Sequence, residues 1–150
     1  MKKRLITFGS LFICLSCICG MCSKDDVVSL VPDDLVGKFK ISGYTLVSNG
    51  ISTNYFATRP SCVKDNIITY SRDYMVSLDE GATKCDPSDP QLVSAKFTLD
   101  GQKINTYTGD EGDDLDEGTI LSVSASGVLV ISFVGGSPGD SAIITYQKQP

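Results

Sequence analysis

Short runs of alternating apolar and polar residues are the feature that most restricts the fold of this chain. From Val93 to Leu99 every odd position is apolar, and the even positions between them are polar. A period of two places alternate side chains on opposite faces, which is typical of a half-buried β-strand. No window longer than about ten residues shows the 3.6-residue period of an amphipathic helix. The pattern therefore predicts an all-β protein.

Similar runs recur along the chain and are separated by glycine, proline, asparagine and aspartate. Gly43 interrupts the first run and predicts a bulge or bend, and Asp100-Gly101 predicts a two-residue type I′ hairpin. About eight sequential antiparallel strands predict an up-and-down barrel, which leaves no exposed edges. A two-sheet β-sandwich has nearly the same local pattern and stays open as the alternative. We expect strands over residues 36–47, 51–56, 67–70, 74–78, 92–99, 102–108, 119–124, 128–134 and 142–147.

The N-terminus differs in composition from the rest of the chain. Residues 1–4 are positively charged, and the apolar stretch from Leu5 to Met21 is short for a membrane span. The segment Cys22-Ser23-Lys24-Asp25-Asp26 follows and resembles a lipid-attachment cysteine with the acidic tract that directs some lipoproteins to the outer cell surface. Cys22 is the favoured anchor, Cys17 is the alternative, and an ordinary cleaved signal peptide remains open. We expect a signal peptide over 1–21, a flexible acidic tether over 22–34 and a folded domain over 35–150.

Cleavage before Cys22 would leave two further cysteines, Cys62 and Cys85, in an oxidising compartment. An even pair there predicts a disulfide, and two free buried thiols are the alternative. The bridge would close a loop of about 24 residues and contribute roughly 3 kcal/mol. The spacing of these cysteines and the absence of histidine exclude a CxxC-type metal site. We expect no metal and no cofactor.

Four segments of the chain stand out by their order and spacing: Leu35-Val36-Gly37-Lys38-Phe39, Cys62-Val63-Lys64-Asp65-Asn66, Lys84-Cys85-Asp86-Pro87-Ser88-Asp89-Pro90-Gln91 and Leu99-Asp100-Gly101-Gln102-Lys103-Ile104. Together they resemble the lipocalin-like domain of small bacterial lipoproteins, which are calycin-type barrels. The resemblance implies that Gly37 and Phe39 belong to the motif at the barrel base. Phe39 departs from the family, which has tryptophan there, and Lys148 is expected to supply the nearby cation. Membership would imply a barrel with one open end, often around an apolar ligand.

Composition removes several function classes. The chain contains no histidine, so Ser-His-Asp and Cys-His nucleophile pairs are excluded. The formal net charge of −5 would repel phosphate backbones, so nucleic acid is not an expected partner. We expect a protein that is not an enzyme. The oligomeric state stays open.

Three groups of polar residues are weaker candidates for a site. Residues 110–117 carry six carboxylates, which could hold Ca²⁺ or form a solvated loop. The pairs Asp86/Asp89 and Asp113/Asp116 could act as the two carboxylates of a glycoside hydrolase. The tyrosines could ring a barrel mouth or lie at core edges; they are Tyr44, Tyr55, Tyr70, Tyr74, Tyr107 and Tyr146.

These observations predict a lipoprotein anchored in a bacterial outer membrane, exposed at the cell surface, that binds or carries a small apolar or amphipathic molecule. The alternative is a surface interaction module whose barrel is filled and whose loops bind a protein or a glycan. A hydrolase is the third possibility and is disfavoured by the absence of histidine. The fold does not decide between them, because function depends on the site.

Overall fold

The computed structural model describes residues 31–108 and 114–150 and shows an all-β protein with one short helix. The strands follow one another in antiparallel hairpins, as the alternating pattern predicts. The elements are β1 (Gly37–Ser48), β2 (Ile51–Asn54), α1 (Ser61–Lys64), β3 (Ile67–Tyr70), β4 (Met75–Asp79), β5 (Leu92–Asp100), β6 (Lys103–Tyr107), β7 (Asp114–Val123), β8 (Val128–Val134) and β9 (Ser141–Lys148).

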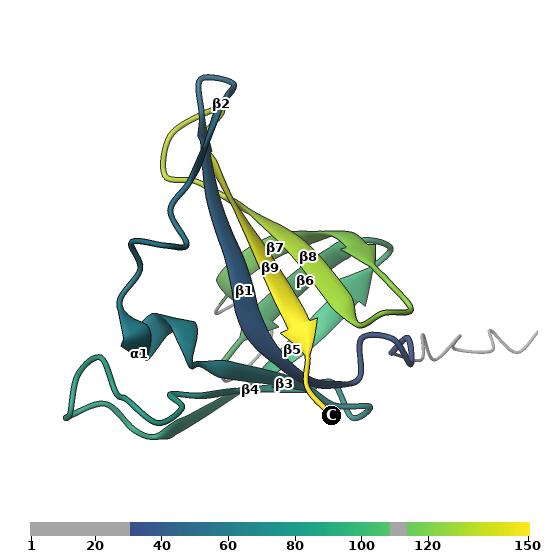
Figure 1. Cartoon of the computed structure of the whole chain (residues 1–150). Helices are drawn as coiled ribbons and strands as arrows, with labels where there is room; N and C mark the ends of the chain where they lie inside the picture. Colours follow the sequence, from purple (N-terminus) through teal and green to yellow (C-terminus); the bar gives the residue numbers. More distant parts are fainter. Residues whose placement is uncertain (1–30, 109–113) are drawn as a thin grey trace, which may run out of the picture.

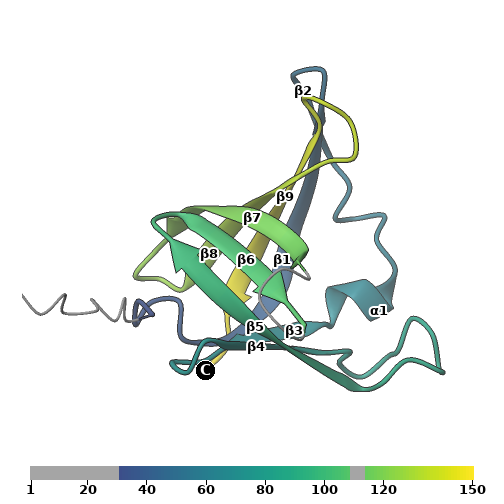
Figure 2. The same ribbon diagram turned by 180° about the vertical axis from the view of Figure 1, so that it is seen from behind.

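Pairing between β1 and β9 closes the sheet into an eight-stranded barrel. The strand order is β2-β1-β3-β4-β5-β6-β7-β8-β9, and β1 also pairs with β9 along most of its length. In Figure 1 these two long strands run side by side across the front of the barrel, and Figure 2 shows β5 to β8 on the far side. Closure removes the edges that an open sheet would expose. The barrel prediction is therefore confirmed, and the two-sheet sandwich is wrong.

Strand β1 contains a bulge and pairs with three other strands, β2, β3 and β9. The register with β9 shifts between Ile41 and Gly43, at the interruption that the sequence predicts. A Cβ atom at Gly43 would lie 3.1 Å from the Cβ of Thr145, so the missing side chain permits close approach of β9. Before the bulge β1 pairs with β3, and beyond it β1 pairs with β2. β2 is therefore an extra strand outside the barrel, at the top of Figure 1.

The segment before β1 closes one end of the barrel. Val31 and Leu35 are 3% and 1% exposed and belong to the same core as Phe39. The turn is held by a hydrogen bond from the Leu35 amide to the Pro32 carbonyl oxygen, 2.9 Å long. The sequence assigns residues 31–34 to a flexible tether, and here the structure differs. The apolar side chain of Val31 gains from burial, so the folded domain already includes residue 31.

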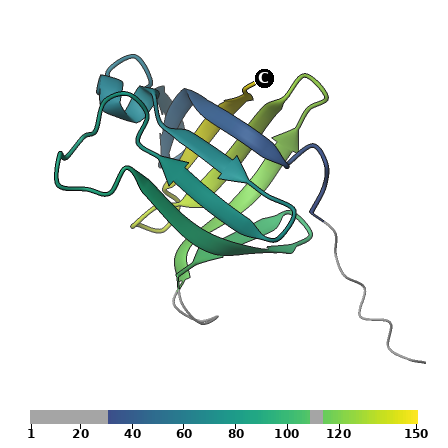
Figure 3. The ribbon, with the colours of Figure 1, turned by 90° about the horizontal axis from the view of Figure 1, so that it is seen from below.

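Helix α1 lies outside the barrel and is joined to the loop between β4 and β5 by a disulfide. Cys62 of α1 is bonded to Cys85 of that loop, with a Cα–Cα distance of 5.1 Å. The two segments project together from one side of the barrel (Figure 3). The predicted disulfide is confirmed. Within the described part of the chain, no helix has the length and apolar character needed to cross a membrane.

Two element boundaries differ from those expected. β7 starts at Asp114 rather than near residue 119, because the acidic segment pairs with β6 as far as Tyr107. The turn after β5 is Gly101-Gln102, since Asp100 pairs with Lys103. Gly101 has a φ of +60°, a conformation that glycine adopts without steric cost. The hairpin is thus present, one residue later than predicted.

Candidate ligand-binding site

The barrel contains a cavity of about 340 Å³, and Phe39 is not among the residues that line it. Seven of the eight barrel strands contribute to its wall. Leu78 and Val93 are 36% and 41% exposed and also line it, so the cavity opens to solvent on their side. The lining residues are Ile68, Tyr70, Val76, Leu78, Val93, Ala95, Ile104, Thr106, Asp116, Phe133, Ile144 and Tyr146.

Strand alternation directs apolar side chains into the lumen. In β5, Val93 and Ala95 line the cavity, and the next residue on that face, Phe97, is fully buried below it. The inward face of this strand is therefore the one that the period of two predicts. Burial deepens along the strand from the open rim to the closed end. The sequence pattern thus positions both the cavity wall and the core beneath it.

Tyr70 separates the cavity from the closed end. Its ring packs edge-on against Phe97, with centroids 5.3 Å apart, and against Phe39 at 6.3 Å. Edge-to-face pairs of this kind add roughly 0.5–1.5 kcal/mol beyond the burial of their area. Only one aromatic of this stack, Tyr70, lines the cavity. The stack therefore forms a rigid floor.

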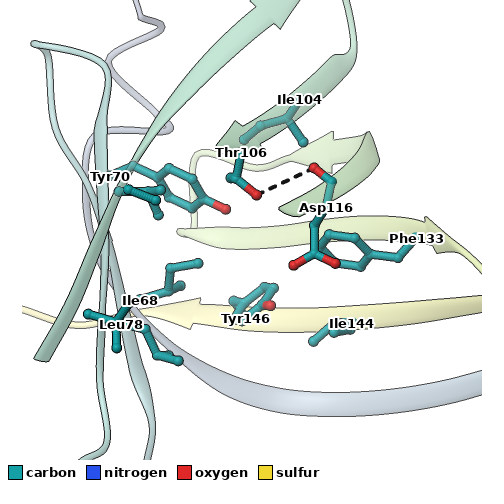
Figure 4. A pocket seen from close by; sticks show the side chains of 12 residues that line it. Ile68, Tyr70, Leu78, Ile104, Thr106, Asp116, Phe133, Ile144 and Tyr146 are labelled. Carbon is teal, nitrogen blue, oxygen red and sulfur yellow. Dashed lines mark hydrogen bonds between the residues drawn. The ribbon is translucent and has the colours of Figure 1, made fainter. Parts of the chain in front are cut away.

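Four polar side chains interrupt the apolar wall: Tyr70, Thr106, Asp116 and Tyr146. Figure 4 shows the phenol of Tyr70 extending toward Thr106 and Asp116, and the Asp116 carboxylate turned toward Tyr146. Thr106 Oγ1 donates a weak hydrogen bond of 3.4 Å to the main-chain oxygen of Asp116. An apolar wall with a few convergent polar groups is the usual composition of a small-molecule site.

The two phenols remain neutral over the physiological pH range. Burial raises the pKa of Tyr70 well above its usual range, and the nearby Tyr146 and Asp116 raise it further. Burial also raises the pKa of Tyr146 to about 12, with a smaller contribution from Asp116. Desolvation disfavours the charged form of a buried acid. Each hydroxyl can therefore both donate and accept a hydrogen bond.

Asp116 and Glu117 lie on opposite faces of β7. Asp116 lines the cavity, whereas Glu117 forms an exposed ion pair with Lys103, 3.7 Å long, on the outside of the barrel. Gly118 follows on the inner face, where a Cβ would meet Ile131 Cγ2 at 2.9 Å. Alternation thus sends one of two adjacent carboxylates into the lumen.

The structure separates the tyrosines that the sequence grouped. Only Tyr70 and Tyr146 line the cavity. The ring of Tyr44 lies 3.8 Å below the Arg59 guanidinium, and Tyr55 is 41% exposed. Tyr74 packs against the core beside Phe97, at 5.6 Å. A complete tyrosine ring at the mouth is therefore absent from the described residues.

The structure describes only some of the acidic residues that the sequence suggests as a calcium site or a hydrolase site. Of residues 110–117, those from 110 to 113 lie outside the described residues, as does the proposed anchor Cys22. The described residues contain no group of three potential metal ligands. Asp86 accepts hydrogen bonds from the Ser88 amide and hydroxyl at 2.8 and 2.7 Å, and these bonds lower its pKa. The Asp86 carboxylate therefore stabilises a surface turn.

The sequence did not identify Asp116 as a residue of the lumen. The signal was present, because residues 116, 118 and 120 share one face of a strand that could have been extended back from residue 119. The density of carboxylates from 110 to 117 favoured a loop instead. The alternation from Val93 to Leu99 indicates one apolar face, but the position of Val93 and Leu78 at an open rim follows only from the closed barrel.

Comparisons of this chain with protein-family models and with curated proteins find no match. The closed eight-stranded antiparallel barrel is consistent with a calycin-like fold. Gly37 and Phe39 lie at its closed end, where Phe39 is fully buried.

Proposed function

We propose that this protein is a lipocalin-like lipoprotein that binds a small apolar or amphipathic molecule inside its barrel. The observation that carries the proposal is the open cavity of about 340 Å³ with a mainly apolar wall. A filled barrel would leave no such space. Burial of a ligand there would contribute about 25 cal/mol for each Å² of apolar surface removed from water.

The closed end supports binding rather than passage of the ligand. Phe39, Phe97 and Leu129 are each fully buried, so a molecule would enter and leave on the side of Leu78 and Val93. A rigid, preformed pocket loses little conformational entropy on binding. These features support a role in carrying or sequestering a molecule.

Native mass spectrometry of the purified chain, incubated with a lipid extract of its source cells, tests the proposal. Wild-type protein should retain a reproducible adduct, whose mass would give the ligand class. Ala95→Phe should fill the cavity and remove the adduct. Ser94→Phe is the matched control, because Ser94 lies on the outer face of the same strand and is exposed. An adduct that survives in Ala95→Phe would place the ligand elsewhere, and no adduct in wild type would oppose binding.

We also propose that the protein is anchored in a bacterial outer membrane through acyl chains on Cys22 and faces the cell surface. The support is the apolar N-terminal stretch followed by Cys22 and an acidic segment. Labelling with palmitate should be lost in Cys22→Ala and kept in Cys17→Ala. Persistent labelling of Cys22→Ala would move the anchor to Cys17. Protease treatment of intact cells should remove the domain if it is at the surface.

A second candidate function is an interaction module, and one observation favours it. Ile51 and Val134 are 70% and 79% exposed. Ile51 is the first residue of β2 and Val134 the last residue of β8, and the β1–β2 hairpin lies beside the β8–β9 loop (Figures 1 and 2). Exposed apolar residues of this size can mark a protein contact. Proximity labelling of the surface should identify a partner that Ile51→Ser with Val134→Ser no longer reaches. Leu121→Ser, which changes an apolar residue 47% exposed, is the control.

A further inference from the structure

The cavity wall carries a single formal charge. Among the twelve residues that line it, Asp116 is the only one with an ionisable acid or base that is charged at neutral pH, and the wall contains no lysine or arginine. The remaining residues are apolar or carry a hydroxyl group. Charges act over longer distances and more strongly beside apolar walls than in bulk water. Asp116 is exposed, so its carboxylate lies on the solvent-facing side of the cavity, where it supplies the formal charge of the wall.

This carboxylate has no cationic partner in the described part of the chain. The ion pairs found there join Arg72 to Asp33 and Lys103 to Glu117. The main-chain oxygen of Asp116 accepts a hydrogen bond from Thr106 Oγ1, and no hydrogen bond joins its carboxylate to another described side chain. Its side chain faces the cavity instead (Figure 4). A carboxylate in such a wall gains most from a cationic hydrogen-bond donor.

Two phenol oxygens lie on the same side of the cavity as this carboxylate. The hydroxyls of Tyr70 and Tyr146 point into the space that Asp116 faces (Figure 4), and neither hydroxyl bonds to another described residue. An ammonium group has three donors, so one can reach the carboxylate while others reach phenol oxygens. The faces of tyrosine and phenylalanine rings also attract cations.

We propose that the ligand of this cavity is an apolar molecule that carries one protonated amine. The proposal rests on the ligand-binding function proposed above and names its ligand class. The amine would bind Asp116 and the two phenols, and the apolar part would lie against Ile68, Val76 and Ala95. A fatty acid would bring a second carboxylate beside Asp116 and would be repelled. The net charge of −5 also favours the approach of cations.

Three probes of equal chain length test this preference: decylamine, decanol and decanoate. Calorimetric titration of the purified full chain, below the concentrations at which the probes aggregate, gives each Kd. We expect decylamine to bind at least about tenfold more tightly than decanol. The reason is that a hydrogen bond to a charged group contributes enough binding free energy for a difference of this size. Decanoate should bind more weakly than decanol. In Asp116→Asn the amine and the alcohol should bind within about threefold of each other.

Glu117→Gln is the control, because it removes the same charge from the outer face of the same strand. It should keep the preference for the amine. Equal binding of decylamine and decanol to wild type would overturn the amine proposal and leave the ligand-binding function in place. A preference that survives Asp116→Asn would also overturn it. Binding of none of the probes would oppose the ligand-binding function itself, and with it the amine proposal.

Discussion

The ammonium group of Lys148 lies 5.6 Å from the centroid of the Phe39 ring. The two residues are directly paired across β1 and β9, so the strand register that closes the barrel also places the cation over the ring. Lys148 Nζ further donates a 3.4 Å hydrogen bond to the main-chain oxygen of Asp34. Lys148 thus joins the last strand to the segment before the first one.

Lys148→Met should destabilise the protein by about 1 kcal/mol. Methionine keeps an apolar stem against Phe39 but removes the cation and its bond to Asp34. The measurement is the free energy of unfolding in urea. Lys96→Met is the control, since Lys96 is an exposed residue of β5 and should change stability little. An unchanged midpoint for Lys148→Met would mean that the charge over Phe39 contributes nothing.

Gly37→Ala should cost about 1–3 kcal/mol. Gly37 has a φ of +138°, which side chains other than glycine rarely adopt, and a Cβ there would lie 2.7 Å from Lys148 Cε. The lysine side chain is flexible and can move away, so most of the cost should come from backbone strain. Gly37→Ala should therefore remain destabilising when it is made in a Lys148→Ala background. Gly136→Ala is the control, because nothing lies within 4 Å of its Cβ position. Equal stability of the two alanine variants would contradict this account.

Reduction of the Cys62–Cys85 bond should lower the free energy of unfolding by about 3 kcal/mol, since the bond restricts the unfolded chain. The barrel itself should persist, because α1 and the β4–β5 loop lie outside it. Urea unfolding of wild type with and without reductant measures the loss. The Cys62→Ala, Cys85→Ala double variant should match reduced wild type and not respond to reductant. If reductant leaves wild type unchanged, the cross-link does not limit unfolding.

Much of the fold could be predicted because each strand carries its own local pattern. The alternation around Phe97, the bulge before Gly43 and the turn at Gly101 follow from chain chemistry over a few residues. Closure does not, because it depends on the register between β1 and β9, which are far apart in sequence. Barrel and sandwich share the same local pattern, and only the long-range pairing separates them.

The cavity was harder to predict than the barrel. Asp116 lies in a run of carboxylates whose composition favours a loop, and only pairing with β6 shows that the run enters a strand. Val31 lies beside prolines and aspartates typical of a tether, yet its side chain fills the closed end. In both residues tertiary contacts override local composition. Cavity volume depends on side chains from seven strands at once, which no local pattern contains.

The phenols in the lumen should make stability depend on alkaline pH. The folded state raises the pKa of Tyr146 to about 12 and that of Tyr70 further, whereas tyrosine in an unfolded chain titrates near about 10. The stability that comes from keeping these phenols neutral is therefore complete below about pH 10 and is lost as pH rises toward about 12. Urea unfolding at pH 9 to 12 should show a decline that is shallower in Tyr146→Phe.

Ultraviolet absorbance of tyrosinate connects this titration to the cavity. The difference between wild type and Tyr146→Phe should develop near pH 12. Asp116 contributes to the raised pKa of Tyr146, so Asp116→Asn should move this step to lower pH, whereas Glu117→Gln should move it less because Glu117 points outward. A step centred near about pH 10 in wild type would mean that Tyr146 meets water freely. The contribution of burial to the raised pKa of Tyr146, and with it the enclosure of the phenol beside Asp116, would then be contradicted.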